Sequence, residues 1–236
     1  MLTACRGLLV FSVIALVSGL ALHVQAQQIN AQQFHIQQLH KERVEVSAFA
    51  NGGFDKFSEK SFVGNTRYQL LSLDGRPVLK ASTKAAASVL YREMKIDLRK
   101  TPFLHWQWRV DNIYNIENQM IKQGDDYPAR VYVVVKDGPF PWQTKALNYV
   151  WSNKKEPQPY WENPFTSSAI MIPVRAGAEG LGQWQQQTVN VADDFYRIFG
   201  RRIKRADGVA IMTDADNHGA SAVAYYADIF FSNSAD

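Results

Sequence analysis

Hydrophobic and polar residues alternate along most of the chain, in short runs that are separated by turn residues. The clearest run is residues 104–110, where Leu, Trp, Trp and Val alternate with His, Gln and Arg. Successive side chains of a strand point to opposite faces, so this spacing predicts strands with one buried face. The predicted strands are Tyr68–Leu73, Val78–Ser82, Met94–Leu98, Leu104–Val110, Arg130–Lys136, Leu147–Trp151, Ala169–Val174, Gln183–Val191, Gly208–Thr213 and Ala220–Phe231.

The segments between these strands predict the fold class. Asp74-Gly75 is typical of a hairpin turn, because both residues tolerate a positive φ. One short helix is predicted at Asp193–Phe199, ended by Gly200. Many short strands with little helix between them indicate an antiparallel arrangement rather than βαβ units. We therefore expect an all-β, jelly-roll-like β-sandwich with one or two short helices.

The start of the chain has the order of a secretory signal. Arg6 supplies a positive charge, Leu8–Leu22 is apolar, and Val24-Gln25-Ala26 is a small-residue cleavage site. The apolar run is shorter than the roughly 20 residues that cross a bilayer. We therefore expect a signal peptide at 1–26, a Gln-rich leader with a first strand at 27–50, and one sandwich domain at 51–236. The expected location is the periplasm or the exterior of the cell, with no membrane span in the mature chain.

Cysteine content and charge narrow the function classes. The single cysteine, Cys5, lies inside the predicted signal, so the mature chain has no disulfide and depends on a packed core. Removal of residues 1–26 removes one Arg and no acid, which leaves a net charge of +3. The densest basic cluster, Arg201 to Arg205, has no interleaved aromatic residue. A solvated turn explains this cluster better than a nucleic-acid surface, so no nucleic-acid partner is expected.

Several segments in a fixed order carry a family resemblance. They are Trp106-Gln107-Trp108-Arg109-Val110, Gly124 to Tyr132, Leu147-Asn148-Tyr149-Val150-Trp151, Asn163-Pro164, Phe199-Gly200 and Gly208 to Asn217. Together they resemble the domain-of-unknown-function family 3047 of bacterial exported proteins, from about Phe54 to the C-terminus. The resemblance implies a bacterial envelope setting and no particular activity. The chain has His218 where the family pattern suggests Thr.

The run at 104–110 offers both core residues and candidate ligand contacts. Trp106 and Trp108 share a face with Leu104 and Val110, which favours core packing over sugar stacking. The opposite face presents His105, Gln107 and Arg109. If Arg130 and Tyr132 point the same way on a neighbouring strand, the sheet has a polar face that bears an aromatic residue. Lectin-like sandwiches use such a face to bind ligands. The alternative is a plain solvated outer face.

Two acidic segments are further candidates. Asp125 and Asp126 lie just before Arg130, where adjacent carboxylates could hold sugar hydroxyls, bind a hard cation, or act as acid and base. A capped turn with one ion pair to Arg130 is the simpler account. Asp126, Arg130 and Asp214 are expected on one rim of the sandwich, because antiparallel neighbours bring the start of one strand to the end of the next.

The segment Asp214-Ala215-Asp216-Asn217-His218-Gly219 resembles the opening of a calcium loop. It fails the EF-hand pattern, because His218 takes the fifth position and Tyr225 stands where the bidentate Glu belongs. Two interpretations remain for this segment. One is a calcium site of another kind that uses Asp214 and Asp216, and the other is a hairpin turn with acidic side chains. No other cofactor is expected.

The sequence carries no motif that names a reaction. Zinc-ligand spacing, a phosphate-binding loop, a nucleophile elbow and a dinucleotide fingerprint are all absent from it. The leading hypothesis is a non-catalytic binding protein for a glycan or another polar ligand of the envelope. The candidate ligand contacts are Gln107, Arg109, Asp125, Asp126, Arg130, Tyr132, Asp214, Asp216 and Asn217.

Two alternatives come from other classes. One is a glycoside hydrolase or polysaccharide lyase on a sandwich, whose acids and bases would come from the four aspartates or Tyr132, with Arg109 or Arg130 neutralising a substrate carboxylate. The other is an envelope scaffold without a small ligand. Carboxylates across an open cleft would favour the hydrolase, whereas a closed convex surface would favour the scaffold.

Overall fold

The computed structural model describes residues 23–30, 42–47, 49, 53–136, 138, 140 and 143–236. The chain divides into two compact units, Met1–Lys41 and Glu42–Asp236. In the first unit residues 23–30 form a helix. Most of the predicted signal peptide, residues 1–22, and residues 31–41 of the predicted leader lie outside the described residues. Within the described part of the chain, no helix has both the length and the apolar character needed to cross a membrane.

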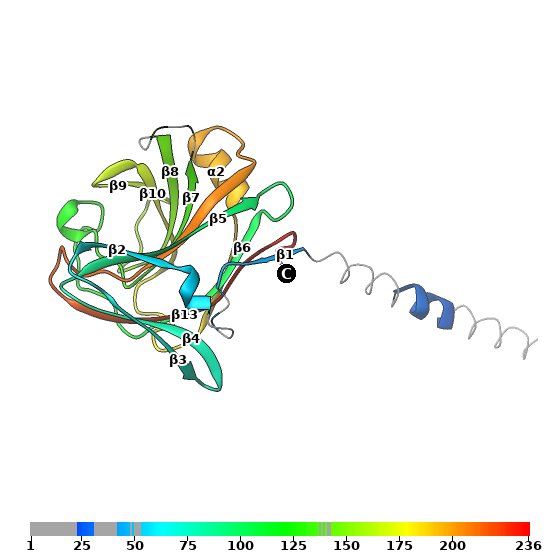
Figure 1. Ribbon diagram of the computed structural model, residues 1–236, viewed down its shortest axis with the longest axis horizontal. Helices are drawn as coiled ribbons and strands as arrows, with labels where there is room; N and C mark the ends of the chain where they lie inside the picture. Colours follow the sequence, from blue (N-terminus) through cyan, green and yellow to red (C-terminus); the bar gives the residue numbers. More distant parts are fainter. Residues whose placement is uncertain are drawn as a thin grey trace, which may run out of the picture. The chain divides into compact units, whose positions relative to one another are not determined.

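The second unit is an all-β, jelly-roll-like sandwich of two sheets (Figure 1). The first sheet has the order β11-β6-β13-β4-β3, and β1 pairs with β13 beside this path. Its strands are β1 Arg43–Glu45, β3 Arg67–Leu73, β4 Arg76–Lys84, β6 Phe103–Val110, β11 Gln185–Asn190 and β13 Ser221–Ser232. β1 lies ahead of residue 51 and pairs with β13, so it is part of this sheet.

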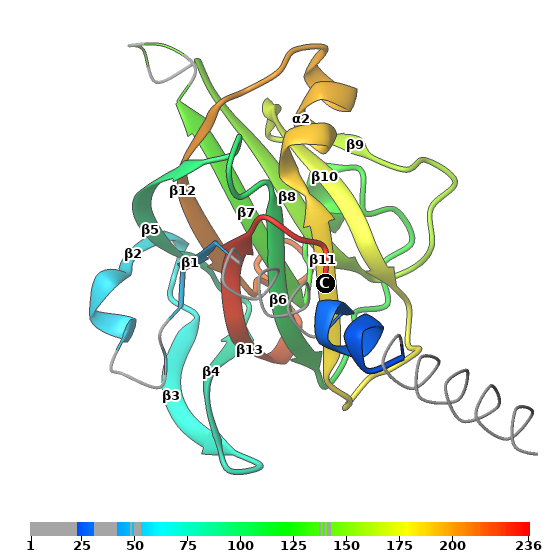
Figure 2. The same ribbon diagram turned by 90° about the vertical axis from the view of Figure 1, so that its right-hand side faces the viewer.

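The second sheet has the order β2-β5-β12-β7-β8-β10-β9 (Figure 2). Its strands are β2 Ser58–Val63, β5 Ala87–Asp97, β7 Ala129–Lys136, β8 Thr144–Ser152, β9 Trp161–Asn163, β10 Thr166–Ala176 and β12 Arg205–Met212. The short helices are η2 Gly53–Lys56, η3 Lys122–Gly124 and α2 Val191–Phe199. The all-β prediction is confirmed.

Local sequence explains the predicted elements that are found. Asp74 and Gly75 both have positive φ, at 53° and 78°, and join β3 to β4. Asn190 caps the start of α2 by accepting a hydrogen bond from the Asp193 amide, and Gly200 ends the helix at φ 71°. Strand periodicity and turn chemistry are local properties, so the sequence is enough to place these elements.

The structure departs from the predicted strands in three places. β10 runs parallel to β8, although all strands were expected to be antiparallel. β2 has no buried residue and β9 is only three residues long, so neither shows the alternation from which strands were predicted. β2 and β9 are the two edge strands of the second sheet.

The core lies between the two sheets. Trp106 and Trp108 on β6 are fully buried, and their rings pack against Tyr149 and Trp151 of β8 at centroid distances of 5.7 and 6.0 Å. The prediction that both tryptophans belong to the core is confirmed. Phe195 of α2 is buried in the same core. Consequently, the alternate residues of β6 face away from it, on the outside of the first sheet.

Candidate functional site

The predicted site residues fall in two separate places. Gln107 and Arg109 lie on β6, in the first sheet, whereas Arg130 and Tyr132 lie on β7, in the second. β6 pairs with β11 and β13, and β7 pairs with β12 and β8. The idea that Arg130 and Tyr132 share a face with Gln107 and Arg109 is therefore wrong. Periodicity shows which residues share a face of their own strand, but it does not show which strands are neighbours.

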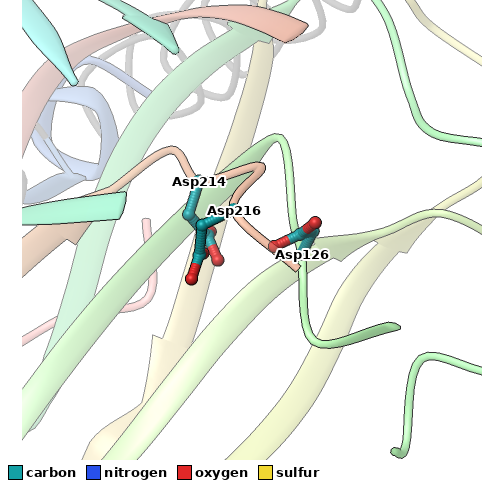
Figure 3. Close-up of side chains that lie close together, drawn as sticks. All are labelled: Asp126, Asp214 and Asp216. Carbon is teal, nitrogen blue, oxygen red and sulfur yellow. The ribbon is translucent and has the colours of Figure 1, made fainter. Parts of the chain in front are cut away.

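The first place is an acidic cluster, which we define as the buried residues Asp125, Asp126, Asp214 and Arg130 together with the half-buried Asp216. Asp126 precedes β7, and Asp214 and Asp216 follow β12. Figure 3 shows Asp214 and Asp216 side by side, with Asp126 near them on a separate loop. One ligand atom from each of these three lies within 4.8 Å of the others. The structure thus brings Asp126, Arg130 and Asp214 to one rim of the sandwich.

Arg130 and Asp214 form the ion pair at the centre of the cluster. The Arg130 Nε donates to Asp214 Oδ1 at 2.7 Å, and Nη2 donates to Asp214 Oδ2. The Arg130 guanidinium also lies over the Tyr127 ring, 4.5 Å from its centroid. The two charged side chains are 3% and 1% exposed. Arginine suits such a buried pair because its planar fork matches a carboxylate.

Asp126 holds the loop that follows Asp214. Its Oδ1 accepts hydrogen bonds from the Asn217 backbone and side-chain nitrogens, both at 3.1 Å, and its Oδ2 accepts one from the His218 amide. The Asp126 carbonyl accepts from Asn153 at 2.8 Å. Asp126 is fully buried. Its carboxylate therefore caps a turn, which is the simpler of the two accounts considered for this residue.

Glycine at position 124 is required next to the cluster. A Cβ on Gly124 would lie 2.0 Å from the carbonyl oxygen of Asn118 and 2.9 Å from the Ile116 side chain. The loop before β7 is therefore tightly packed, and it fixes the place of Asp125. The Asp125 Oδ2 accepts from Asn163 at 2.8 Å, whereas its buried Oδ1 has no hydrogen-bond partner.

The cluster holds four carboxyl groups and one guanidinium, so it has a surplus of negative charge. Burial raises the pKa of Asp125 and the pKa of Asp214, and Arg130 opposes both shifts. Burial also raises the pKa of Asp216, with a further contribution from the neighbouring Asp126 carboxylate. Like charges in a poorly solvated site favour the protonated form.

This geometry limits what the cluster can do chemically. A hydrolase needs carboxyl groups about 5 to 10 Å apart that face a substrate. Asp125, Asp126 and Asp214 are 4%, 0% and 1% exposed. Three of the four acids are therefore buried, and Asp216 is the half-buried one.

The same cluster contains the residues that could hold a metal ion. Calcium takes about 6 to 8 oxygen ligands. The oxygens of Asp214 are turned to Arg130, and those of Asp126 accept from Asn217 and His218. The cation beside Asp214 in this structure is Arg130. Calcium at Asp214 and Asp216 stays a prediction, and it would have to share these oxygens with the present donors.

The second place is the outer face of the first sheet. We define the aromatic–cationic face as Arg76, Lys80, Gln107, Arg109, Trp184 and Tyr225, all half-buried. Arg76 lies over the Trp184 ring, 4.0 Å from its centroid, and donates to Gln107 Oε1 at 2.9 Å. Tyr225 meets the Trp184 ring edge-on at 6.5 Å. Two aromatic rings thus stand among three cations and an amide on a partly exposed surface.

Register explains how these residues meet. Tyr225 of β13 is paired with Arg109 of β6 on one side and with Lys80 of β4 on the other. The Arg109 and Lys80 charges lie 5.5 and 5.8 Å from the Tyr225 ring centroid. The sequence prediction missed Arg76, Lys80, Trp184 and Tyr225. Trp184 immediately precedes β11. Its period-two spacing from Gln186 places both residues on the same face of the predicted strand, and this spacing is the signal that could have found Trp184.

His105 does not belong to this face, although its position in the alternation suggested that it would. It is 3% exposed. Its ring stacks on Phe230 at 4.6 Å, and Nε2 lies 2.7 Å from the Ser232 hydroxyl. The bulge in β13 between Ala227 and Phe230 brings Phe230 over this end of β6. The open part of the face therefore begins at Gln107.

Solved structures with a similar arrangement of strands include carbohydrate-active and carbohydrate-binding proteins. A cellulase variant derived from Cel12A of Rhodothermus marinus is 8% identical with a TM-score of 0.45, and the match covers 81% of this chain and 99% of that one. The family 11 carbohydrate-binding module of Clostridium thermocellum, in complex with a mixed-linked tetrasaccharide, is 9% identical with a TM-score of 0.42, covering 81% and 94%. A loop-swap mutant of Xyn11A from Necallimastix patriciarum is 12% identical with a TM-score of 0.43, covering 81% and 99%. At this level the likeness concerns the sandwich architecture and assigns no function.

Sequence comparison places the chain in a family. The search of curated proteins gives no match. The sequence profile of the family described as "Protein of unknown function (DUF3047)" matches residues 55–230, which is most of the second unit. This agrees with the resemblance seen in the motifs between Trp106 and Asn217. The chain therefore belongs to the DUF3047 family of proteins of unknown function.

Proposed function

We propose that this protein is an exported, non-catalytic binding protein for a glycan or another polar ligand of the bacterial envelope. The observation that carries the proposal is the aromatic–cationic face. Sugar rings stack on indole and phenol faces, and their hydroxyls accept hydrogen bonds from guanidinium and amide groups. Trp184 and Tyr225 supply the rings, and Gln107 and Arg109 supply polar groups on a rigid strand between them.

Two further features support this choice of face. The Arg76 Nε and Nη2 atoms and the Trp184 Nε1 atom are buried without a hydrogen-bond partner. The core residues Trp106 and Trp108 also have unpaired indole nitrogens, but on this half-buried face a ligand that accepts hydrogen bonds could satisfy the free donors. In the acidic cluster, in contrast, four of the five side chains are buried, and the Asp126 carboxylate holds the loop at Asn217 and His218 in place.

A glycan array, run with and without calcium, tests the proposal. For a glycan that binds, we expect Trp184→Ala to weaken binding about tenfold, which corresponds to about 1.4 kcal/mol. Phe62→Ala is the matched control, because Phe62 is 58% exposed and lies on β2 of the other sheet. Equal affinities of the two variants would refute the assignment of this face. Binding that needs calcium and is lost in Asp216→Asn would move the site to the acidic cluster.

Export is tested separately. The n-region, apolar region and small-residue site predict that the mature protein begins at Gln27. N-terminal sequencing of the protein from envelope fractions should therefore read Gln27-Gln28-Ile29. Recovery of a form that begins at Met1 would contradict cleavage but would leave the binding face unaffected.

A further inference from the structure

The positive charge of the chain is concentrated at one end of the sandwich. We define the basic end as the described residues of three segments, 93–100, 136–145 and 193–207. These segments hold ten Lys and Arg residues and six Asp and Glu residues, a surplus of four. The net charge of the whole chain is also +4. The remainder of the protein is therefore neutral on balance, although it includes the three cations of the aromatic–cationic face, and the basic end carries the net positive charge.

Backbone pairing brings the three segments together. Arg205 at the start of β12 is paired with Asp97 at the end of β5, and the Leu98 amide donates to the Lys204 carbonyl at 3.0 Å. The Lys136 amide at the end of β7 donates to Asp207 at 2.9 Å. The clustering of charge follows from strand order, because the three segments are far apart in the sequence.

Part of the basic charge is not neutralised locally. Lys136 pairs with Glu93 at 3.2 Å, and Arg205 pairs with Asp207 at 2.8 Å. Lys95, Lys100 and Lys204 are exposed, and among the described residues none of them forms an ion pair. Three exposed ammonium groups that form no ion pair among the described residues thus stand at the same end.

Exposed aromatic residues accompany these cations. Tyr196 on α2 is 48% exposed, and Arg202 lies 4.8 Å from its ring centroid. Phe140 between β7 and β8 is 52% exposed. Aromatic side chains beside lysines and arginines are typical of surfaces that rest on the headgroup region of a bilayer. A nucleic-acid surface would instead track a phosphate backbone along a groove or stripe.

We propose that the basic end docks on a membrane surface rich in anionic phospholipid. The lysines and arginines would attract the lipid phosphates, an attraction that weakens with added salt, and Tyr196 and Phe140 would reach the interface. The aromatic–cationic face is formed by other residues. Docking at the basic end therefore does not depend on the function proposed for that face.

Vesicle co-sedimentation tests this surface. The readout is the ratio of the affinity for vesicles of equal parts phosphatidylglycerol and phosphatidylcholine to the affinity for phosphatidylcholine alone. We expect a triple variant, Lys95→Gln, Lys100→Gln and Lys204→Gln, to lower this ratio at least about tenfold. The control variant, Lys56→Gln, Lys60→Gln and Lys122→Gln, loses the same charge from exposed positions outside the basic end. It should retain most of the wild-type ratio.

Three results would overturn the proposal. One is a wild-type protein that does not distinguish the two vesicle types at low salt. Another is an equal loss in the two triple variants, which would mean that only net charge matters. The third is stronger binding to a soluble anionic polysaccharide that displaces the protein from anionic vesicles. All variants are made in the same full chain, so any contribution from residues 1–41 is common to them.

Discussion

Two arginine–aspartate pairs in this molecule have the same chemistry and different surroundings. Arg130–Asp214 belongs to the acidic cluster, with side chains 3% and 1% exposed. Arg109–Asp111 borders the aromatic–cationic face, with side chains 28% and 33% exposed and a contact of 3.0 Å. An exposed pair is screened by water and contributes little to stability, whereas breaking a buried pair strands a charge. The comparison predicts that the fold depends on both partners of the buried pair, while the half-buried Arg109 can exchange Asp111 for a ligand at little cost in stability.

The largest effect is expected from Arg130→Ala. Loss of the guanidinium leaves the carboxyl groups of the acidic cluster without their cation, so the free energy of unfolding should fall by about 3 to 5 kcal/mol. Arg109→Ala is the matched control and should change stability by less than about 1 kcal/mol. Denaturant unfolding measures both. Similar losses in the two variants would show that burial does not separate these pairs.

A comparable loss of stability is expected when a core-facing residue of β6 is truncated. Trp106 is fully buried while its neighbour Gln107 faces outward, so Trp106→Ala should cost about 3 to 5 kcal/mol and Gln107→Ala much less. Thermal unfolding and glycan binding are measured for each variant. If Trp106→Ala kept wild-type stability and lost only glycan binding, the assignment of faces along β6 would be wrong.

The smallest effect concerns pH and Asp216. Its folded-state pKa is raised, so it stabilises the protein below the unfolded value of 3.8, and this contribution is lost as the pH rises through the folded value. At neutral pH we therefore expect ionised Asp216 to destabilise the folded state. Asp216→Asn should therefore raise the melting temperature at pH 7, by a gain of at most about 1 kcal/mol, and leave it unchanged near pH 3.

Melting temperatures measured with and without calcium test which cation the acidic cluster uses. If Arg130 is the working cation of the acidic cluster, added calcium or a chelator should hardly move the melting temperature of the wild type. A rise with calcium that disappears in Asp216→Asn would instead assign a cation to Asp126, Asp214 and Asp216. In that case Asp216→Asn would destabilise the protein whenever calcium is present.

Much of the fold and part of the site could be predicted from the sequence. Trp106 and Trp108 were assigned to the core because their spacing is a property of a single strand. The helix before Gly200 and the turn at Asp74 follow from side-chain chemistry within a few residues. For the same reason Gln107 was placed on the outside of β6. The parallel pairing of β10 with β8 leaves no such local trace.

What the sequence determined by itself is therefore the alternation within each strand, the turns, the helix cap and the family. Only the tertiary structure decided which strands are neighbours. It separated Arg130 from Arg109 by placing their strands in different sheets, it joined Tyr225 to Arg109 across more than a hundred residues, and it buried most of the acidic cluster. The physical reason is that periodicity encodes which side of a strand is apolar, whereas pairing and burial depend on how the whole set of strands closes into one core.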